Sequence, residues 1–134
     1  ATPLPSNNSS VAALALPDGR CVVAFNNTAT GARWPLTLAV SSDWGETFDR
    51  VRDLVDTTGY EHVRHGLYGE HSYPTLLMHP NGTQIDVAWT HCRSTVKHAR
   101  IDIAWLAGGD GLSVGDFRHR AGGAGGGGGG GGGG

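Results

Sequence analysis

The sequence has little of several features that mark whole classes of protein. It carries two cysteines, Cys21 and Cys92, which are too few for a disulfide-stabilised scaffold, although a single bridge between them is left open. Ten basic and twelve acidic residues give a net charge of −2, so the basic surface of a nucleic-acid-binding protein is not expected. No apolar run approaches the ~20 residues that cross a bilayer, so no membrane span is expected either.

Glycine is abundant, but its abundance is confined to one end of the chain. Of the 23 glycines, twelve lie within residues 122–134, where Ala124 is the single interruption. Such a run has no side chains to bury and a large backbone entropy to lose, which predicts a disordered, low-complexity tail over residues 107–134. Residues 1–106 are therefore expected to carry the fold.

Short apolar runs separated by turn residues predict an all-β chain. Residues 48–55 fit either a strand or one helical turn. The other expected strands are 10–16, 20–26, Leu36–Ser41, 73–78, 84–90 and 95–106.

These strands are organised in an internal repeat. Residues 10–26 and 72–90 each contain a strand, an Asx-Gly turn and a second strand that ends in Val-Ala-aromatic; the turn glycines are Gly19 and Gly82, 63 residues apart. A third strand is expected after each copy, at Leu36–Ser41 and at 101–106. Repeats of this size and content are typical of propeller blades. Because two blades cannot close a ring, the chain is expected to be part of a larger protein.

One eight-residue motif is more specific than the strand pattern. Residues 41–48, Ser-Ser-Asp-Trp-Gly-Glu-Thr-Phe, fit the pattern S-x-D-x-G-x-T-[FW] from Ser41 onwards. Asp43 and Thr47 can hydrogen-bond the backbone of a tight hairpin, and Gly45 can adopt backbone angles that other residues resist. Phe48 is expected to insert between sheet layers. We interpret Asp43 as a structural residue, because a carboxylate this close to a turn usually forms the turn.

This motif and its setting resemble the sialidase (neuraminidase) superfamily, in particular the branch with BNR/Asp-box repeats. The resemblance also rests on L-P-D-G-R at 16–20, R-x-P-L-T-L-A-V-S at 33–41, G-E-x-S-Y-P at 69–74 and V-K-H-A at 96–99. Members of that family form six-bladed β-propellers. The resemblance therefore implies a C-terminal part of such a propeller, about two blades of six.

The resemblance also implies roles for individual residues. Tyr73 would be the nucleophile, and Arg33 would be one of three arginines that bind the substrate carboxylate. Sialidases are the tyrosine exception among glycosidases that otherwise use two carboxylates, because a neutral phenol avoids repulsion by the sugar's own carboxylate. Glu70 is a local candidate for the base that such a phenol needs, although residues i and i+3 of an extended segment face opposite ways. Arg93 is a candidate for a second contact to an anionic sugar, with a solvated edge as the alternative.

The implied function is that of a glycosidase of the exo-α-sialidase type, which cleaves terminal acidic sugars without a cofactor. The family's general-acid aspartate and first two arginines lie on earlier blades and have no equivalent here, so this chain alone is expected to be inactive. One alternative is a non-catalytic Asp-box propeller that binds a glycan or a protein, and another is a hydrolase or lyase on the same fold that acts on a different acidic sugar. No metal site is expected, because the pair His62 and His65 lacks a recognisable set of further ligands. Sequons at Asn7, Asn8, Asn26 and Asn81 favour a secreted or luminal protein only slightly.

Overall fold

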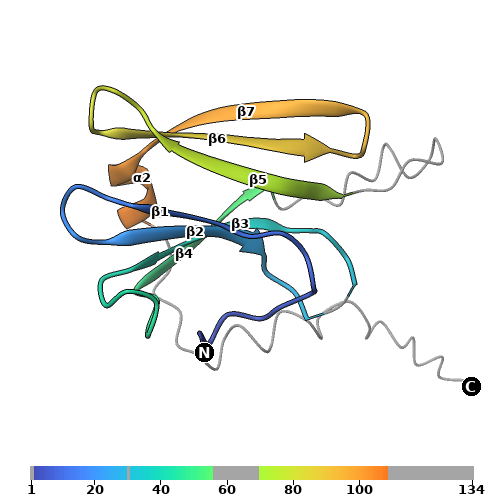
Figure 1. The fold of residues 1–134 in the computed structure, drawn as a ribbon, viewed down its shortest axis with the longest axis horizontal. Helices are drawn as coiled ribbons and strands as arrows, with labels where there is room; N and C mark the ends of the chain where they lie inside the picture. The colour runs from blue at the N-terminus through green and yellow to red at the C-terminus, as the bar shows by residue number, and fades with distance from the viewer. Residues whose placement is uncertain (1, 30, 56–69, 109–134) are drawn as a thin grey trace, which may run out of the picture.

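The computed structural model describes residues 2–29, 31–55 and 70–108 of the chain, and in this part the structure consists of two antiparallel sheets and one short helix (Figure 1). The first sheet has the strand order β1 (Ala12–Ala15), β2 (Cys21–Asn26), β3 (Leu36–Ser41) and β4 (Arg50–Val55). The second sheet has the order β5 (His71–Met78), β6 (Gln84–His91) and β7 (Thr95–Asp102). The prediction of an all-β chain with the strands of partial propeller blades is confirmed, and residues 50–55 form a strand and not a helical turn.

The first two strands of each sheet form the same kind of hairpin, as the repeat predicts. In the first, the Gly19 N–H donates to the carbonyl of Leu16, and in the second the Gly82 N–H donates to the carbonyl of His79. Gly19 has a φ of 88° and Gly82 a φ of 71°, which are angles that glycine adopts without a steric penalty. The two turn glycines therefore have the same local role in the two sheets.

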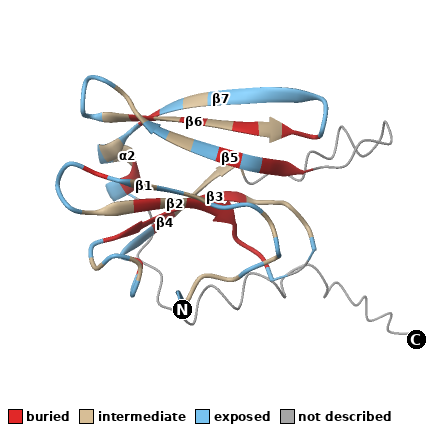
Figure 2. Ribbon diagram, viewed as in Figure 1, coloured by how far each residue is buried: buried red, intermediate tan, exposed pale blue. Residues whose placement is uncertain are grey.

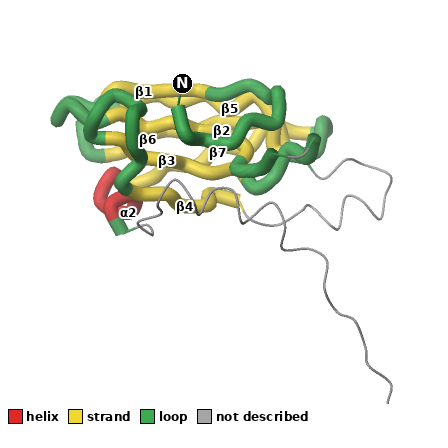
Figure 3. Tube along the Cα trace, turned by 90° about the horizontal axis from the view of Figure 1, so that it is seen from below, coloured by secondary structure: helices red, strands yellow, loops and turns green. Residues whose placement is uncertain are grey.

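The main hydrophobic core lies between the two sheets (Figure 2). Alternate residues of β6 point into it, so Ile85 and Val87 are fully buried, and the first sheet contributes Val22 and Leu38 from its facing side. Figure 3 shows the two sheets from below, with α2 (Ile103–Ala107) at one end of the strands. Burial of this shared core is the main term that holds the two sheets together.

The third strand of the second repeat differs from the expectation. It ends at Asp102, which pairs with Gln84 at the start of β6, so the residues beyond have no neighbouring strand to extend the ladder. Residues 103–107 instead form α2, and the Leu106 side chain is buried in the core. The Arg52 guanidinium of β4 lies 3.9 Å from the Trp105 ring centroid and donates to the Trp105 carbonyl at 2.7 Å. The helix therefore joins the last strand of the second sheet to the last strand of the first.

The strand directions define two ends of the sheets, which Figure 1 shows on opposite sides. The β1–β2 and β5–β6 turns, the β3–β4 hairpin and α2 lie at one end, which we call the Asp-box end. The β2–β3 loop, the start of β5 and the β6–β7 turn lie at the other, which we call the Arg33 end.

Some predictions made from the sequence concern residues that the structure does not describe, and others concern the two cysteines and membrane-spanning segments. The glycine tail beyond residue 108 lies outside them, as do His62 and His65. Cys21 and Cys92 are both free thiols, so the bridge that was left open between them does not form; they lie at opposite ends of the strands. Within residues 2–108, apart from the undescribed positions, no helix is long and apolar enough to cross a membrane.

Candidate functional site

Tyr73 lies at the start of β5 in an unusual backbone conformation. The pairing of β5 with β6 shifts register between Ser72 and Thr75, and Tyr73 has a φ of 52°. A bulge of this kind redirects a side chain away from the regular alternation of the strand. The Tyr73 side chain is consequently 62% exposed, whereas Ser72 and Pro74 on either side are buried.

Arg33 reaches Tyr73 from the β2–β3 loop. Its carbonyl accepts a hydrogen bond from the His71 N–H at 2.8 Å, which fixes the loop against the start of β5. The Arg33 guanidinium carbon then lies 5.5 Å from the centroid of the Tyr73 ring, within the range of a cation–π contact. The structure thus brings together two predicted site residues that are forty positions apart in the sequence.

The Arg33 guanidinium differs from the other described arginines in its partners. Within the described part of the chain, Arg33 is the arginine whose guanidinium has neither a hydrogen bond nor a carboxylate partner. The side chains that do have one are Arg20, Arg50, Arg52, Arg93 and Arg100. A planar cation with this freedom is suited to bidentate binding of a carboxylate ligand.

Glu70 and Arg93 form an ion pair beside these residues. Arg93 Nε donates to Glu70 Oε1 at 2.6 Å, and the Ser72 hydroxyl donates to the same oxygen at 3.2 Å. Burial raises the pKa of Glu70, but the hydrogen bonds from Arg93 and Ser72 and the charges of Arg93 and Arg33 outweigh it and hold the pKa below its usual range. Between these described residues, no hydrogen bond joins Glu70 to Tyr73. The structure therefore pairs Glu70 with Arg93 and not with the phenol.

The turn that carries Arg93 is strained, which the sequence does not indicate. Cys92 and Arg93 have φ angles of 52° and 55°, a conformation for which two-residue hairpin turns normally use Asn or Gly. Glu70 holds this turn twice, because its carbonyl also accepts the Cys92 N–H at 2.7 Å. The sequence contains no glycine or asparagine signal here that would have predicted the turn type.

A buried histidine pair lies at the same end, and nothing in the spacing of His71 and His91 in the sequence predicts it. The Nδ1 atoms of His71 and His91 are 3.2 Å apart, and the two rings stack with centroids 5.1 Å apart. The Asn26 amide donates to the His71 carbonyl at 3.1 Å, which ties β2 to β5. Among the residues that the structure describes, no group of three or more His, Cys, Asp or Glu side chains could hold a metal ion.

The Asp-box motif lies at the opposite end of the strands, in the β3–β4 hairpin. Asp43 accepts hydrogen bonds from the Thr47 backbone and hydroxyl at 2.8 and 2.5 Å and from the Ser41 hydroxyl at 2.8 Å, and these bonds lower its pKa to about 2. Ser41 also accepts the N–H of Gly45, whose φ is 91°. The side chains of Ser41, Asp43 and Thr47 are therefore engaged in the turn itself, at the opposite end of the strands from Arg33 and Tyr73.

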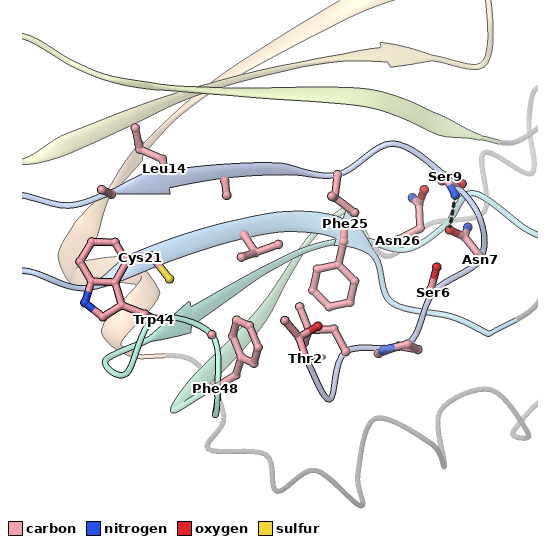
Figure 4. A pocket seen from close by; sticks show the side chains of 17 residues that line it. Thr2, Ser6, Asn7, Ser9, Leu14, Cys21, Phe25, Asn26, Trp44 and Phe48 are labelled. Atoms are coloured by element: carbon pink, nitrogen blue, oxygen red, sulfur yellow. Dashed lines mark hydrogen bonds between the residues drawn. The ribbon is translucent and has the colours of Figure 1, made fainter.

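Phe48 packs differently from the expectation. It does not enter the core between the two sheets but lies on the outward face of the first sheet, in a second cluster with Phe25, Ala39 and Val51. A groove of about 540 Å³ runs over this face, beneath the N-terminal residues (Figure 4). None of the four predicted catalytic and binding residues lines the groove.

Comparisons with known proteins agree with the fold. No curated protein matches the chain at a significant level. A family model for the BNR repeat-like domain matches residues 1–87, which is more than half of the chain and includes Arg33, the Asp box, Glu70 and Tyr73, whereas Arg93 lies beyond it. The chain therefore belongs to the BNR repeat-like domain family.

Proposed function

We propose that this chain is the C-terminal part of a sialidase-like glycoside hydrolase that removes terminal acidic sugars, with Tyr73 as the nucleophile and Arg33 as a ligand for the sugar carboxylate. The observation that carries the proposal is the contact between them: an exposed phenol lies 5.5 Å from a guanidinium that forms no hydrogen bond or ion pair with the described residues. An anionic sugar that binds Arg33 would place its anomeric carbon, which bears the carboxylate, close to Tyr73.

The proposed reaction proceeds by double displacement. A base takes the proton of the Tyr73 phenol as its oxygen attacks the anomeric carbon, the bond from that carbon to the leaving oxygen breaks, and the leaving oxygen takes a proton from a general acid. Water then gives a proton to the deprotonated acid and attacks the same carbon, and the Tyr73 oxygen leaves and regains its proton from the base. Glu70 is engaged by Arg93, so the proposal takes both the acid and the base from other parts of the protein, as the family resemblance implies. The isolated chain is accordingly proposed to bind but not to hydrolyse.

A second candidate is a non-catalytic propeller that binds an acidic glycan. The ion pair of Glu70 favours this alternative, because no carboxylate among the described residues is hydrogen-bonded to Tyr73. The Asp box does not distinguish the two candidates, because Ser41, Asp43 and Thr47 bond one another within its own turn.

Turnover of a fluorogenic sialoside by the whole protein separates the candidates. Tyr73→Phe keeps the aromatic ring beneath Arg33, so substrate should still bind while kcat falls by at least about a thousandfold. Arg33→Gln should instead raise KM, because it removes a charged ligand of the substrate. Wild-type turnover by Tyr73→Phe would remove this residue from the mechanism. Binding without turnover in the unmodified protein would favour the glycan-binding alternative.

A further inference from the structure

The role of Glu70 can be inferred from what it contacts. Its side chain is 10% exposed, and both of its oxygens lie within reach of Arg93, at 2.6 and 3.4 Å. The Ser72 hydroxyl, itself buried, donates to the first of these oxygens. A carboxylate that already accepts three charged or polar donors is poorly placed to take a proton from a phenol.

The Arg93 side chain has the opposite character. It is 59% exposed, so the ion pair joins a buried carboxylate to a guanidinium that faces solvent. A fully exposed ion pair fixes its side chains only weakly, but here one partner is immobilised by burial and by Ser72. The arrangement therefore holds an exposed guanidinium in one place.

The backbone conformation at Arg93 is a second observation that points to a functional role for the Glu70–Arg93 ion pair. Cys92 and Arg93 both have positive φ, which costs free energy in residues with a Cβ atom and would cost little in glycine. The Glu70 carbonyl and carboxylate each bind this turn, so the contacts of one residue offset the strain. Strain of this kind is concentrated at functional sites, where a side chain is needed at a position that the backbone disfavours.

We propose that Glu70 is a positioning residue, and that it holds Arg93 as a second guanidinium for the negative charge of the sugar bound at Arg33. This inference rests on the proposed function and assigns Glu70 a role other than that of the base. Arg33 and Arg93 lie at the same end of the sheets, since the Arg33 carbonyl is bound by His71, next to Glu70 in the chain. The ligand class is a sugar with a carboxylate, and the site discriminates it from the corresponding neutral ester.

The test measures binding of two probes to the 134-residue chain by NMR titration: the methyl α-glycoside of N-acetylneuraminic acid and the methyl ester of the same sugar. Glu70→Gln and Arg93→Gln change the net charge in opposite directions. If Glu70 only lowers the positive charge of the site, Glu70→Gln should bind the acid more tightly. If Glu70 positions Arg93, both variants should bind the acid about tenfold more weakly, with little change for the ester.

A double-mutant cycle and a matched pair of controls complete the test. Because Glu70 acts through Arg93, Glu70→Gln should have almost no further effect in the Arg93→Gln background. Asp86→Asn and Arg100→Gln make the same charge changes in an ion pair on the outward face of the second sheet and should leave binding unchanged. Thermal unfolding of each variant establishes that it is folded.

The outcomes separate this inference from the proposed function. Tighter acid binding by folded Glu70→Gln, or unchanged binding by Arg93→Gln, would overturn the positioning role, and the proposed function would stand if Arg33→Gln still abolished binding. Equal binding of acid and ester by the unmodified chain would overturn both.

Discussion

The two ends of the strands are built in different ways. At the Asp-box end, the hydrogen bonds that shape the β3–β4 hairpin join Ser41, Asp43, Gly45 and Thr47, all within seven residues. At the Arg33 end, the contacts join residues that are far apart in the sequence: Asn26 to His71, Arg33 to Tyr73, and Glu70 to Arg93. The Asp-box hairpin is thus a local motif, although α2 also joins the two sheets at that end, whereas the contact between Arg33 and Tyr73 exists only when both sheets have assembled.

The backbone angles show the same difference. The glycines with positive φ that the structure describes, Gly19, Gly45 and Gly82, all lie in turns at the Asp-box end. At the Arg33 end the positive angles belong to Tyr73, Cys92 and Arg93, and also to Asn8, whose neighbour Asn7 bonds the β2–β3 loop. Asparagine tolerates this conformation, but the other three keep side chains where glycine would be less strained, and at the Asp-box end Trp44 resembles them. We infer that the first end is arranged for stability and the second for binding and chemistry.

The two ends should differ most in the unfolding free energy that is lost when one aromatic residue at each end is replaced. Phe48→Ala removes a ring that is 4% exposed and packs in the outward cluster, and it should cost about 3–5 kcal/mol of unfolding free energy. Tyr73→Ala removes a ring that is 62% exposed and should change stability by about 0.5 kcal/mol or less. Urea unfolding of the two variants measures both effects. Equal losses would show that Tyr73 is a structural residue.

The difference between the ends also explains what could be predicted from the sequence. The Asp box is contiguous, so its residue types and spacing predict both the hairpin and the hydrogen bonds of Asp43. The strands were predicted to within a few residues, because alternating burial leaves a pattern in the sequence. The predicted C-terminal end of β7 was wrong. The strand stops at Asp102 because its partner β6 begins at Gln84, and the residue types at 103–106 do not show where the pairing ends.

The Arg33 end could be predicted only as a set of candidate residues. Family resemblance indicated Tyr73 and Arg33, but their contact depends on a bulge at a tyrosine, a residue type that does not signal positive φ. The spacing of Glu70 and Tyr73 argued against Glu70 as the base for the Tyr73 phenol. The structure adds a different reason, since Glu70 forms an ion pair with Arg93. Whether these residues catalyse a reaction stays a prediction.

A smaller effect is expected from one hydroxyl group of the Asp-box end. Ser41→Ala removes a fully buried oxygen that bonds Asp43 and accepts the N–H of Gly45, so it should cost about 1–3 kcal/mol. The neighbouring Ser42 is exposed and bonds only Asp49 among the described residues, so Ser42→Ala is a matched control with an expected change of about 0.5 kcal/mol or less. A similar loss in both variants would mean that the motif is not the cooperative unit inferred here.

The smallest effect is expected from pH, and it sharpens the comparison because both ends contain a carboxyl group with a lowered pKa. The folded-state pKa of Asp43 is about 2, against an ordinary value of 3.8. Since a lowered pKa stabilises the fold above the unfolded-state value, this contribution should be complete above about pH 4 and lost as the pH falls towards 2. The thermal midpoint of the wild type should therefore decline in this window more steeply than that of Asp43→Asn, in which the group cannot titrate. Glu70→Gln should keep the Asp43-dependent decline, because the described hydrogen bonds of Asp43 all join it to residues of its own hairpin. Loss of the decline in Glu70→Gln would instead show that the two ends titrate as one unit, and that their separation into a structural and a functional end is wrong.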